Sequence, residues 1–288
     1  MHRLRTVAVL PTMFTLANLI CGFFSIVVAA RVDAPTSIEI PTTPDITLRQ
    51  VMQRQLNPHD PTHNVMLSGW LIFLAMIFDA LDGHVARLTK QSTDFGAQLD
   101  SLCDCVTFGV APGFLLVKMC PQFTYLHREV VWIIAASYAA CAALRLARFN
   151  VETGEDDDHL HFSGLPSPAA AASIASFGIL FYELRRQGNL FQYAEQIDVV
   201  VQRALPLFAV VVALLMVSRI PYPHVVNQMF RGQRGLGHVV ALLFTIGAIM
   251  AIHAYSVPVI CAAFVLAAPI KFAWARYHDR KENHDPIF

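Results

Sequence analysis

Long apolar segments separated by shorter polar connections run through most of this 288-residue chain. A helix needs roughly twenty apolar residues to cross a bilayer, and about eight segments approach that length. They lie at about residues 7–30, 65–89, 95–118, 129–149, 167–183, 204–218, 237–254 and 257–275. The pattern predicts an all-α fold, a polytopic membrane helical bundle of about eight transmembrane helices. The weak polar break at 255–258 leaves the division between the last two spans open.

The polar connections predict the domain organisation. We expect residues 1–275 to form one transmembrane domain and residues 276–288 a charged cytoplasmic tail. The domain is interrupted at 31–64 by a proline-bearing extramembrane insert, with a short helix at about 46–56. No small-residue cleavage site follows the first apolar segment, so we expect a retained first helix rather than a signal peptide.

Composition agrees with a membrane protein. Hydrophobic residues make up 55% of the chain and charged residues only 15%, well below the usual quarter of a soluble domain. The formal net charge is zero and no basic run occurs, so we expect no nucleic-acid partner. The six cysteines are scattered without the spacing of a disulfide framework or a metal site, and we interpret them as small buried hydrophobes.

Four aspartates stand out against this apolar background: Asp79, Asp82, Asp100 and Asp104. Residues three or four apart share a helix face, so they form two acidic pairs. One pair ends the second span and the other begins the third, which places both pairs at one membrane face. Carboxylate oxygens are the ligands that magnesium and manganese prefer, and two such ions can clamp a phosphate. The spacing predicts a site for two divalent ions.

The residues between the acids complete a longer motif. It reads Asp79-x2-Asp82-Gly83-x2-Ala86-Arg87-x8-Gly96-x3-Asp100-x3-Asp104. Small residues at three of these positions allow a backbone to approach a partner helix or a bulky ligand, and the arginine is within reach of a phosphate on the same side. The motif resembles the signature of the CDP-alcohol phosphatidyltransferases, membrane enzymes that displace CMP from a CDP-linked lipid or alcohol.

Further segments are similar to the phosphatidylserine synthase branch of that family. They are LPTMFTLANLICG (10–22), DSLCDCVTFGVAP (100–112), ALRLARFN (143–150), FSGLPSPAAA (162–171) and SRIPYP (218–223). Thr12 stands where the branch commonly has an asparagine. The resemblance implies transfer of a phosphatidyl group from CDP-diacylglycerol to L-serine, giving phosphatidylserine and CMP. It does not extend to the insert at 31–64, the loop around 184–203 or the residues after Lys271.

The resemblance also implies roles for the acids. Asp79, Asp82 and Asp100 would hold two ions, Mg²⁺ or Mn²⁺, on the pyrophosphate of the donor. Asp104 would share a metal and act as the general base for the serine hydroxyl. We expect a direct displacement, because no Ser–His or Cys–His pair offers a covalent intermediate.

Eight residues are candidates for substrate binding. We expect the small residues near the acids to let cytidine and pyrophosphate lie close to the backbone. Thr93 would donate to a phosphate, and Arg87 would bind a phosphate or order the acids. Asn18 would contact the CDP group or, with Thr15, bond between helices. Arg145 and Arg148 would bind the lipid phosphate or the serine carboxylate, or anchor the helix at the inner face. The set is Asn18, Gly83, Ala86, Arg87, Thr93, Gly96, Arg145 and Arg148.

Charge asymmetry predicts the orientation. With the N-terminus inside, thirteen of the 21 Lys and Arg residues fall on the inner side, as the positive-inside rule requires. We therefore expect a multi-pass protein of the cell's inner membrane, with its active site at the cytoplasmic face. The resemblance implies a homodimer.

Two alternatives remain. The same fold could use another acceptor, such as glycerol 3-phosphate or an inositol phosphate. Intramembrane acids also mark ion pathways, so a divalent-cation transporter is the second alternative. Against a transporter, the four acids lie at one face, none continues across the midplane, and Arg87 would oppose cation passage. The choice of metal, the lipid-chain preference and the role of the insert stay open.

Overall fold

The computed structural model describes residues 9–32, 61–89, 94–152, 164–186, 194–222 and 253–282. Their elements are α1 (Val9–Ala30), α3 (Pro61–Thr89), α4 (Asp94–Asp104), the π-helix η1 (Cys105–Val110), α5 (Ala111–Met119), α6 (Pro121–Glu152), α7 (Ser167–Arg186), α8 (Ala194–Val217) and α11 (His253–Glu282). These described residues contain helices and no β-strand, so the predicted all-α class is confirmed.

Seven helical segments of the described part are long and apolar enough to cross a membrane. They match seven of the eight predicted spans. The remaining one, predicted at 237–254, lies outside the described residues except for its last two, which belong to α11. The short helix predicted at 46–56 also lies outside them. Helix α3 begins at Pro61, inside the predicted end of the insert, and α11 continues to Glu282, beyond the predicted end of the last span.

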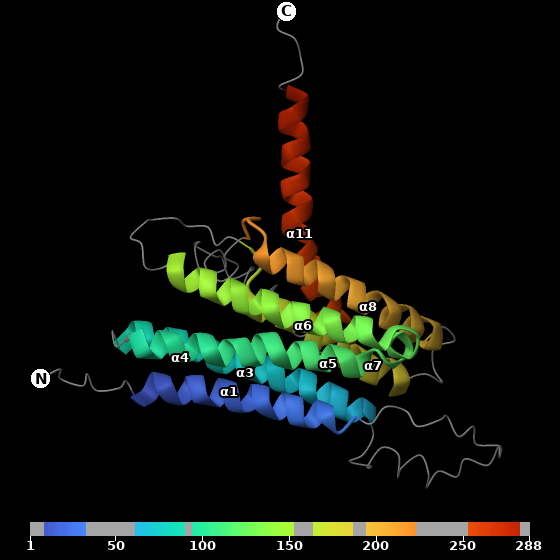
Figure 1. Cartoon of the computed structure of the whole chain (residues 1–288), viewed down its shortest axis with the longest axis horizontal. Helices are drawn as coiled ribbons and strands as arrows, with labels where there is room; N and C mark the ends of the chain where they lie inside the picture. The colour runs from blue at the N-terminus through green and yellow to red at the C-terminus, as the bar shows by residue number, and fades with distance from the viewer. Residues whose placement is uncertain are drawn as a thin grey trace, which may run out of the picture.

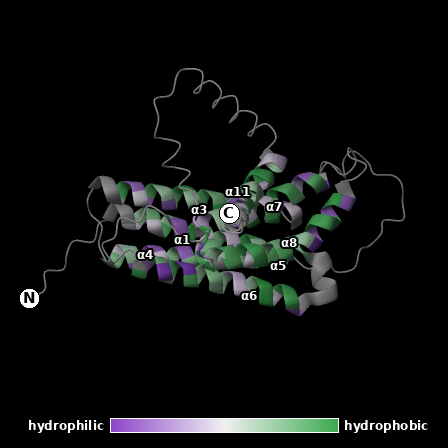
Figure 2. Ribbon diagram, turned by 90° about the horizontal axis from the view of Figure 1, so that it is seen from above, coloured by the Kyte–Doolittle hydropathy of each residue, from purple (hydrophilic) through white to green (hydrophobic). Residues whose placement is uncertain are grey.

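The helices form a bundle in which some helices pack against neighbours in sequence and others against helices distant in sequence. Helix α1 packs along α3, α3 packs against α7, and α6 packs against α8 (Figure 1). Helix α11 contacts α7 and stands steeply across the other helices, with its C-terminal part projecting beyond them. Most of the ribbon is hydrophobic, and hydrophilic residues gather around α4 (Figure 2).

Close helix contacts depend on small residues. A Cβ atom on Gly69 of α3 would lie 2.7 Å from the carbonyl oxygen of Ala175 on α7, and one on Gly178 of α7 would lie 3.0 Å from that of Val65 on α3. Each helix thus contributes a glycine at a point where the other backbone comes close. Small residues have this role in membrane bundles because the apolar lipid provides little hydrophobic drive for helix association.

The third predicted span is helical throughout but not uniformly α-helical. Helices α4 and α5 are joined by the six-residue π-helix η1, which begins directly after Asp104. The hydroxyl of Tyr138 on α6 donates to the carbonyl oxygen of Phe108 in η1 at 3.3 Å, and Tyr138 is fully buried. Segments of π-helix are rare in proteins, but those that occur are often found at functional sites. The residues just before η1 are therefore candidates for a functional role.

The segments 162–171 and 218–223, both similar to the family branch, meet just before α7. Gly164 adopts a φ of 90°, and its N–H donates to the carbonyl of Ile220 at 3.0 Å. The N–H of Leu165 donates to the carbonyl of Leu215, also at 3.0 Å. A Cβ on Gly164 would lie 2.5 Å from the carbonyl oxygen of Met216. A glycine is therefore required here both by the backbone angle and by the close approach.

Candidate metal centre

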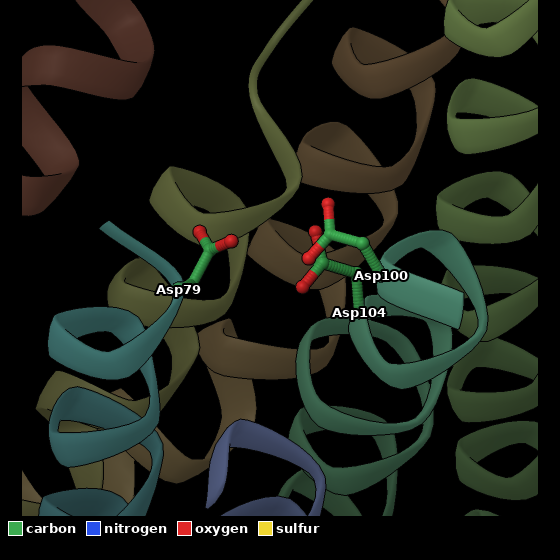
Figure 3. A group of neighbouring side chains, drawn as sticks. All are labelled: Asp79, Asp100 and Asp104. Atoms are coloured by element: carbon green, nitrogen blue, oxygen red, sulfur yellow. The ribbon is translucent and has the colours of Figure 1, made fainter. Parts of the chain in front are cut away.

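Three aspartates from two helices converge in the bundle. Asp79 lies on α3, and Asp100 and Asp104 lie one turn apart on α4. One carboxylate oxygen from each lies within 4.8 Å of the others. Figure 3 shows Asp79 reaching from its helix toward the two acids of α4. Asp104 is buried, whereas Asp79 and Asp100 are half-buried.

This arrangement is electrostatically costly without a cation. Two unit charges about 5 Å apart repel by about 3 kcal/mol at an effective dielectric constant of about 20. Three such carboxylates, in helices of membrane-spanning composition, have no low-cost way to be ionised together. Their donor atoms are all oxygens, as hard divalent cations prefer. The group therefore fits Mg²⁺ or Mn²⁺.

Asp82 is held differently from the other three aspartates. It lies on α3 one turn after Asp79 and is buried. Thr15 on α1 donates its hydroxyl to Oδ2 of Asp82 at 2.5 Å. The other oxygen, Oδ1, is buried and has no hydrogen-bond partner among the described residues. The structure thus brings three of the four predicted ligands into one group and places the fourth against α1, with one oxygen unpartnered.

Asn18 contacts the acidic group directly. Its Nδ2 donates to Oδ1 of Asp104 at 2.9 Å, and the Asn18 side chain is fully buried. Its backbone carbonyl accepts a hydrogen bond from the Thr107 hydroxyl at 3.3 Å. The sequence left two interpretations of Asn18, a contact with the CDP group or, together with Thr15, a hydrogen bond between helices, and the structure shows hydrogen bonds between helices for both residues. The three-residue spacing of Thr15 and Asn18 was the signal that both share one face of α1.

Arg145 brings positive charge to the same region. It lies on α6, half-buried, and its charge acts on both Asp104 and Asp79. Its Nη1 donates to the hydroxyl of Ser167, the first residue of α7, at 2.7 Å. Its guanidinium also lies over the ring of Phe149, 5.8 Å from the centroid. Arg148 is half-buried on the same helix.

A polar pair that sequence reasoning missed joins α4 to α6. The Nδ2 of Asn150 donates to the hydroxyl of Ser101 at 2.9 Å, and that hydroxyl also lies 3.1 Å from Oδ1 of Asn150. Ser101 follows Asp100, and Asn150 lies in the same motif as Arg145. The available signal was that Ser101 lies in the segment 100–112 and Asn150 in the segment 143–150, both of which are similar to the same family branch.

The remaining candidates are only partly described. Gly83 on α3 and Gly96 on α4 are half-buried. Ala86 and Arg87 lie in the last turn of α3, with side chains outside the described part, and Thr93 lies outside the described residues altogether.

The fold and the site together define a class. This is a multi-pass membrane protein of helices, with an oxygen-only acidic group of the kind that binds divalent cations. The sequence model of the CDP-alcohol phosphatidyltransferase family matches residues 8–217. The chain belongs to the CDP-alcohol phosphatidyltransferase family, as the acidic motif predicted.

Within this family, the chain is similar to curated proteins whose names include serine. A CDP-diacylglycerol–serine O-phosphatidyltransferase of Methanocaldococcus jannaschii is 37% identical over 160 residues, which are 56% of this chain and 65% of the relative. One from Helicobacter pylori is 32% identical over 163 residues, 57% of this chain and 63% of the relative. An archaetidylserine synthase of Methanothermobacter thermautotrophicus is 37% identical over 157 residues, 54% of this chain and 57% of the relative. The match thus spans somewhat less than two thirds of each relative.

Proposed function

We propose that this chain transfers a phosphatidyl group from CDP-diacylglycerol to L-serine, releasing CMP, in a reaction that depends on divalent metal ions. The observation that carries the proposal is the meeting of Asp79, Asp100 and Asp104, with one oxygen of each within 4.8 Å of the others. The names of the relatives support serine as the acceptor, since both the CDP-diacylglycerol–serine O-phosphatidyltransferase and the archaetidylserine synthase have serine in their names.

The described residues fit two ions. Asp79, Asp100 and Asp104 would supply one oxygen each, and the unpartnered Oδ1 of Asp82 is a further buried acceptor. Bound Mg²⁺ or Mn²⁺ would neutralise the pyrophosphate charge that develops as CMP leaves. The aspartates would orient that pyrophosphate so that the serine oxygen approaches in line with the departing CMP oxygen.

Asp104 is our candidate for the general base. It would accept the proton of the serine hydroxyl while the serine oxygen forms a bond to the lipid-side phosphorus and the bond from that phosphorus to CMP breaks. Asp104 is buried, so bulk water is a poor competitor for this proton. No covalent intermediate is needed in such a single displacement.

The remaining roles are proposals of the same kind. Arg145, anchored by Ser167 and close enough for its charge to act on the acids, is suited to the serine carboxylate or the lipid phosphate. Arg148, Gly83, Ala86, Arg87, Thr93 and Gly96 stay candidate substrate contacts. A cytoplasmic active site in the inner membrane and a homodimer remain predictions from charge asymmetry and from the family resemblance.

One assay tests the reaction and its acceptor together. Purified protein in detergent would receive CDP-diacylglycerol, Mn²⁺ or Mg²⁺, and either L-serine, glycerol 3-phosphate, an inositol phosphate or no acceptor. We expect CMP release that requires serine and metal and is lost in Asp100→Asn. Release with a different acceptor would preserve the chemistry and change the specificity. No release with any acceptor would contradict the transferase proposal.

A further inference from the structure

Helix α1 supplies no carboxylate to the acidic group, yet it contacts two of the four motif aspartates. Thr15 and Asn18 lie three residues apart on α1, and both are buried. Thr15 donates to Asp82 on α3, and Asn18 donates to Asp104 at the end of α4. One face of α1 therefore bridges the two helices that carry the acids.

Other contacts fix α1 in place independently of these two bonds. The Ser25 hydroxyl lies 2.8 Å from the Ser68 hydroxyl and donates to the Ser68 carbonyl at 3.1 Å, tying α1 to α3. A Cβ on Gly22 would overlap Thr107 of η1, so a glycine is needed where α1 meets the π-helix. These contacts lie in the C-terminal half of α1, so they fix the position of the helix that carries Thr15 and Asn18.

Each donor occupies one oxygen of its carboxylate. A carboxylate with one oxygen held by a hydrogen bond loses most of its freedom to rotate. Its second oxygen is then presented in a fixed direction, and in Asp82 that oxygen is buried without a partner among the described residues. The Oδ1 of Asn18 is a second buried acceptor without such a partner. Buried acceptors of this kind are costly unless a ligand satisfies them.

We propose that Thr15 and Asn18 are positioning residues, which orient Asp82 and Asp104 for divalent-cation binding. This inference rests on the proposed metal-dependent function, and it assigns Asn18 to a carboxylate rather than to the nucleotide. Residues that orient metal ligands typically change metal affinity or activity by about 10–100-fold when they are removed. Helix α1 is then part of the metal centre without ligating it.

The experiment measures cation binding without turnover. Protein in detergent, free of substrate, is titrated with Mn²⁺, and the dependence of the melting temperature on Mn²⁺ concentration gives the apparent dissociation constant for Mn²⁺, called the Mn²⁺ midpoint below. Thr15→Val removes the hydroxyl at nearly constant volume, Asn18→Leu removes the amide donor, and Thr15→Ser retains a hydroxyl. Ser25→Ala is the matched control, because it removes a hydrogen bond from the same α1–α3 interface away from the acids.

We expect Thr15→Val and Asn18→Leu to raise the Mn²⁺ midpoint by about 10–100-fold. Thr15→Ser and Ser25→Ala should stay within about threefold of the unmodified chain. The midpoint of the titration is compared, so a lower melting temperature in the metal-free state does not mimic the effect.

Two results would overturn the inference alone. One is an unchanged Mn²⁺ midpoint in both Thr15→Val and Asn18→Leu. The other is an Asn18→Leu variant with an unchanged midpoint and a raised KM for CDP-diacylglycerol, which would make Asn18 a nucleotide contact. If the unmodified chain itself gains no stability from Mn²⁺ or Mg²⁺, the metal part of the proposed function fails and this inference fails with it.

Discussion

Two regions of the bundle contain aspartates within membrane-spanning helices, and they treat the charge in opposite ways. On α8, Oδ2 of Asp198 accepts from the Nε of Arg185 on α7 at 3.3 Å and from the Nε2 of Gln202 at 2.8 Å, so one acid meets one base and one amide. Its Oδ1, like that of Asp82, is buried without a partner among the described residues, so the contrast lies in the charge and not in the unpartnered oxygen. At the candidate metal centre, Asp79, Asp100 and Asp104 meet each other. A paired acid is explained by structure alone, whereas three converging acids form the kind of group that a divalent cation would stabilise.

The nearby arginine does not remove this contrast. The positive charge of Arg145 attracts Asp104 and Asp79, but its Nη1 donates a hydrogen bond to Ser167. A single positive charge also leaves three carboxylates under-compensated. The difference teaches that the number of acids in a membrane protein is less informative than the balance of their charge. A compensated acid joins helices, and an uncompensated group is a candidate binding site for cations.

The largest expected effect comes from the buried acid of the centre. Asp104→Asn keeps the shape of the side chain but removes the charge and the proton acceptor, so we expect CMP release to fall by about 10²–10⁴-fold, the usual contribution of a general base. Metal-dependent binding of CDP-diacylglycerol should be partly retained. Turnover restored at saturating substrate would argue against the base role. Asp198→Asn is the matched control and should retain activity within a few-fold.

Removing the positive charge of Arg145 should have an intermediate effect. A hydrogen bond to a charged group is worth about 1.5–3 kcal/mol, so Arg145→Ala should lower kcat/KM by about 10–150-fold. Varying serine and CDP-diacylglycerol separately will show which KM rises, and hence whether Arg145 binds the carboxylate or the lipid phosphate. Arg276→Gln, an exposed arginine on α11, serves as the control. Equal losses in both variants would indicate a general effect of charge rather than a role at the centre.

The approach of α1 to the π-helix provides a test through packing alone. In Gly22→Val, the added Cβ would overlap Thr107, and overpacking typically costs about 1–3 kcal/mol. We expect a melting temperature lower by several degrees and weaker Mn²⁺ stabilisation, because Asn18 lies one turn away on the same helix. Phe23→Leu changes the exposed neighbour and should leave both values unchanged. A stable Gly22→Val variant with a normal Mn²⁺ midpoint would show that α1 tolerates displacement.

Much of the acidic group was accessible from the sequence because its geometry is local. The four-residue spacing of Asp100 and Asp104 places them on one face of α4, and two successive spans end and begin at the same membrane face. Those two facts predict the meeting with Asp79. The seven described spans were predicted for a similar reason, since membrane helices are marked by long apolar runs.

What the sequence could not provide are contacts between distant segments and changes of helical register. Thr15 and Asp82 are 67 residues apart, and Asn18 and Asp104 are 86 apart. No spacing rule predicts that α1 lies against those acids rather than others. Likewise, the π-helix Cys105–Val110 is invisible to a 3.6-residue periodicity, although its wider turn changes the direction of every side chain between α4 and α5.

The smallest effect is expected at the paired acid. Arg185 and Asp198 are both partly accessible to solvent, and exposed ion pairs contribute about 0.2–1 kcal/mol. Arg185→Gln, Asp198→Asn and the double variant should therefore lower the melting temperature by at most about 4 °C, with no change in the Mn²⁺ midpoint. A double variant less affected than the sum of the single variants would confirm that the two charges interact. If any of the three changed the Mn²⁺ midpoint, the two regions would be coupled, and the distinction between a structural acid and a cation-binding group would no longer hold.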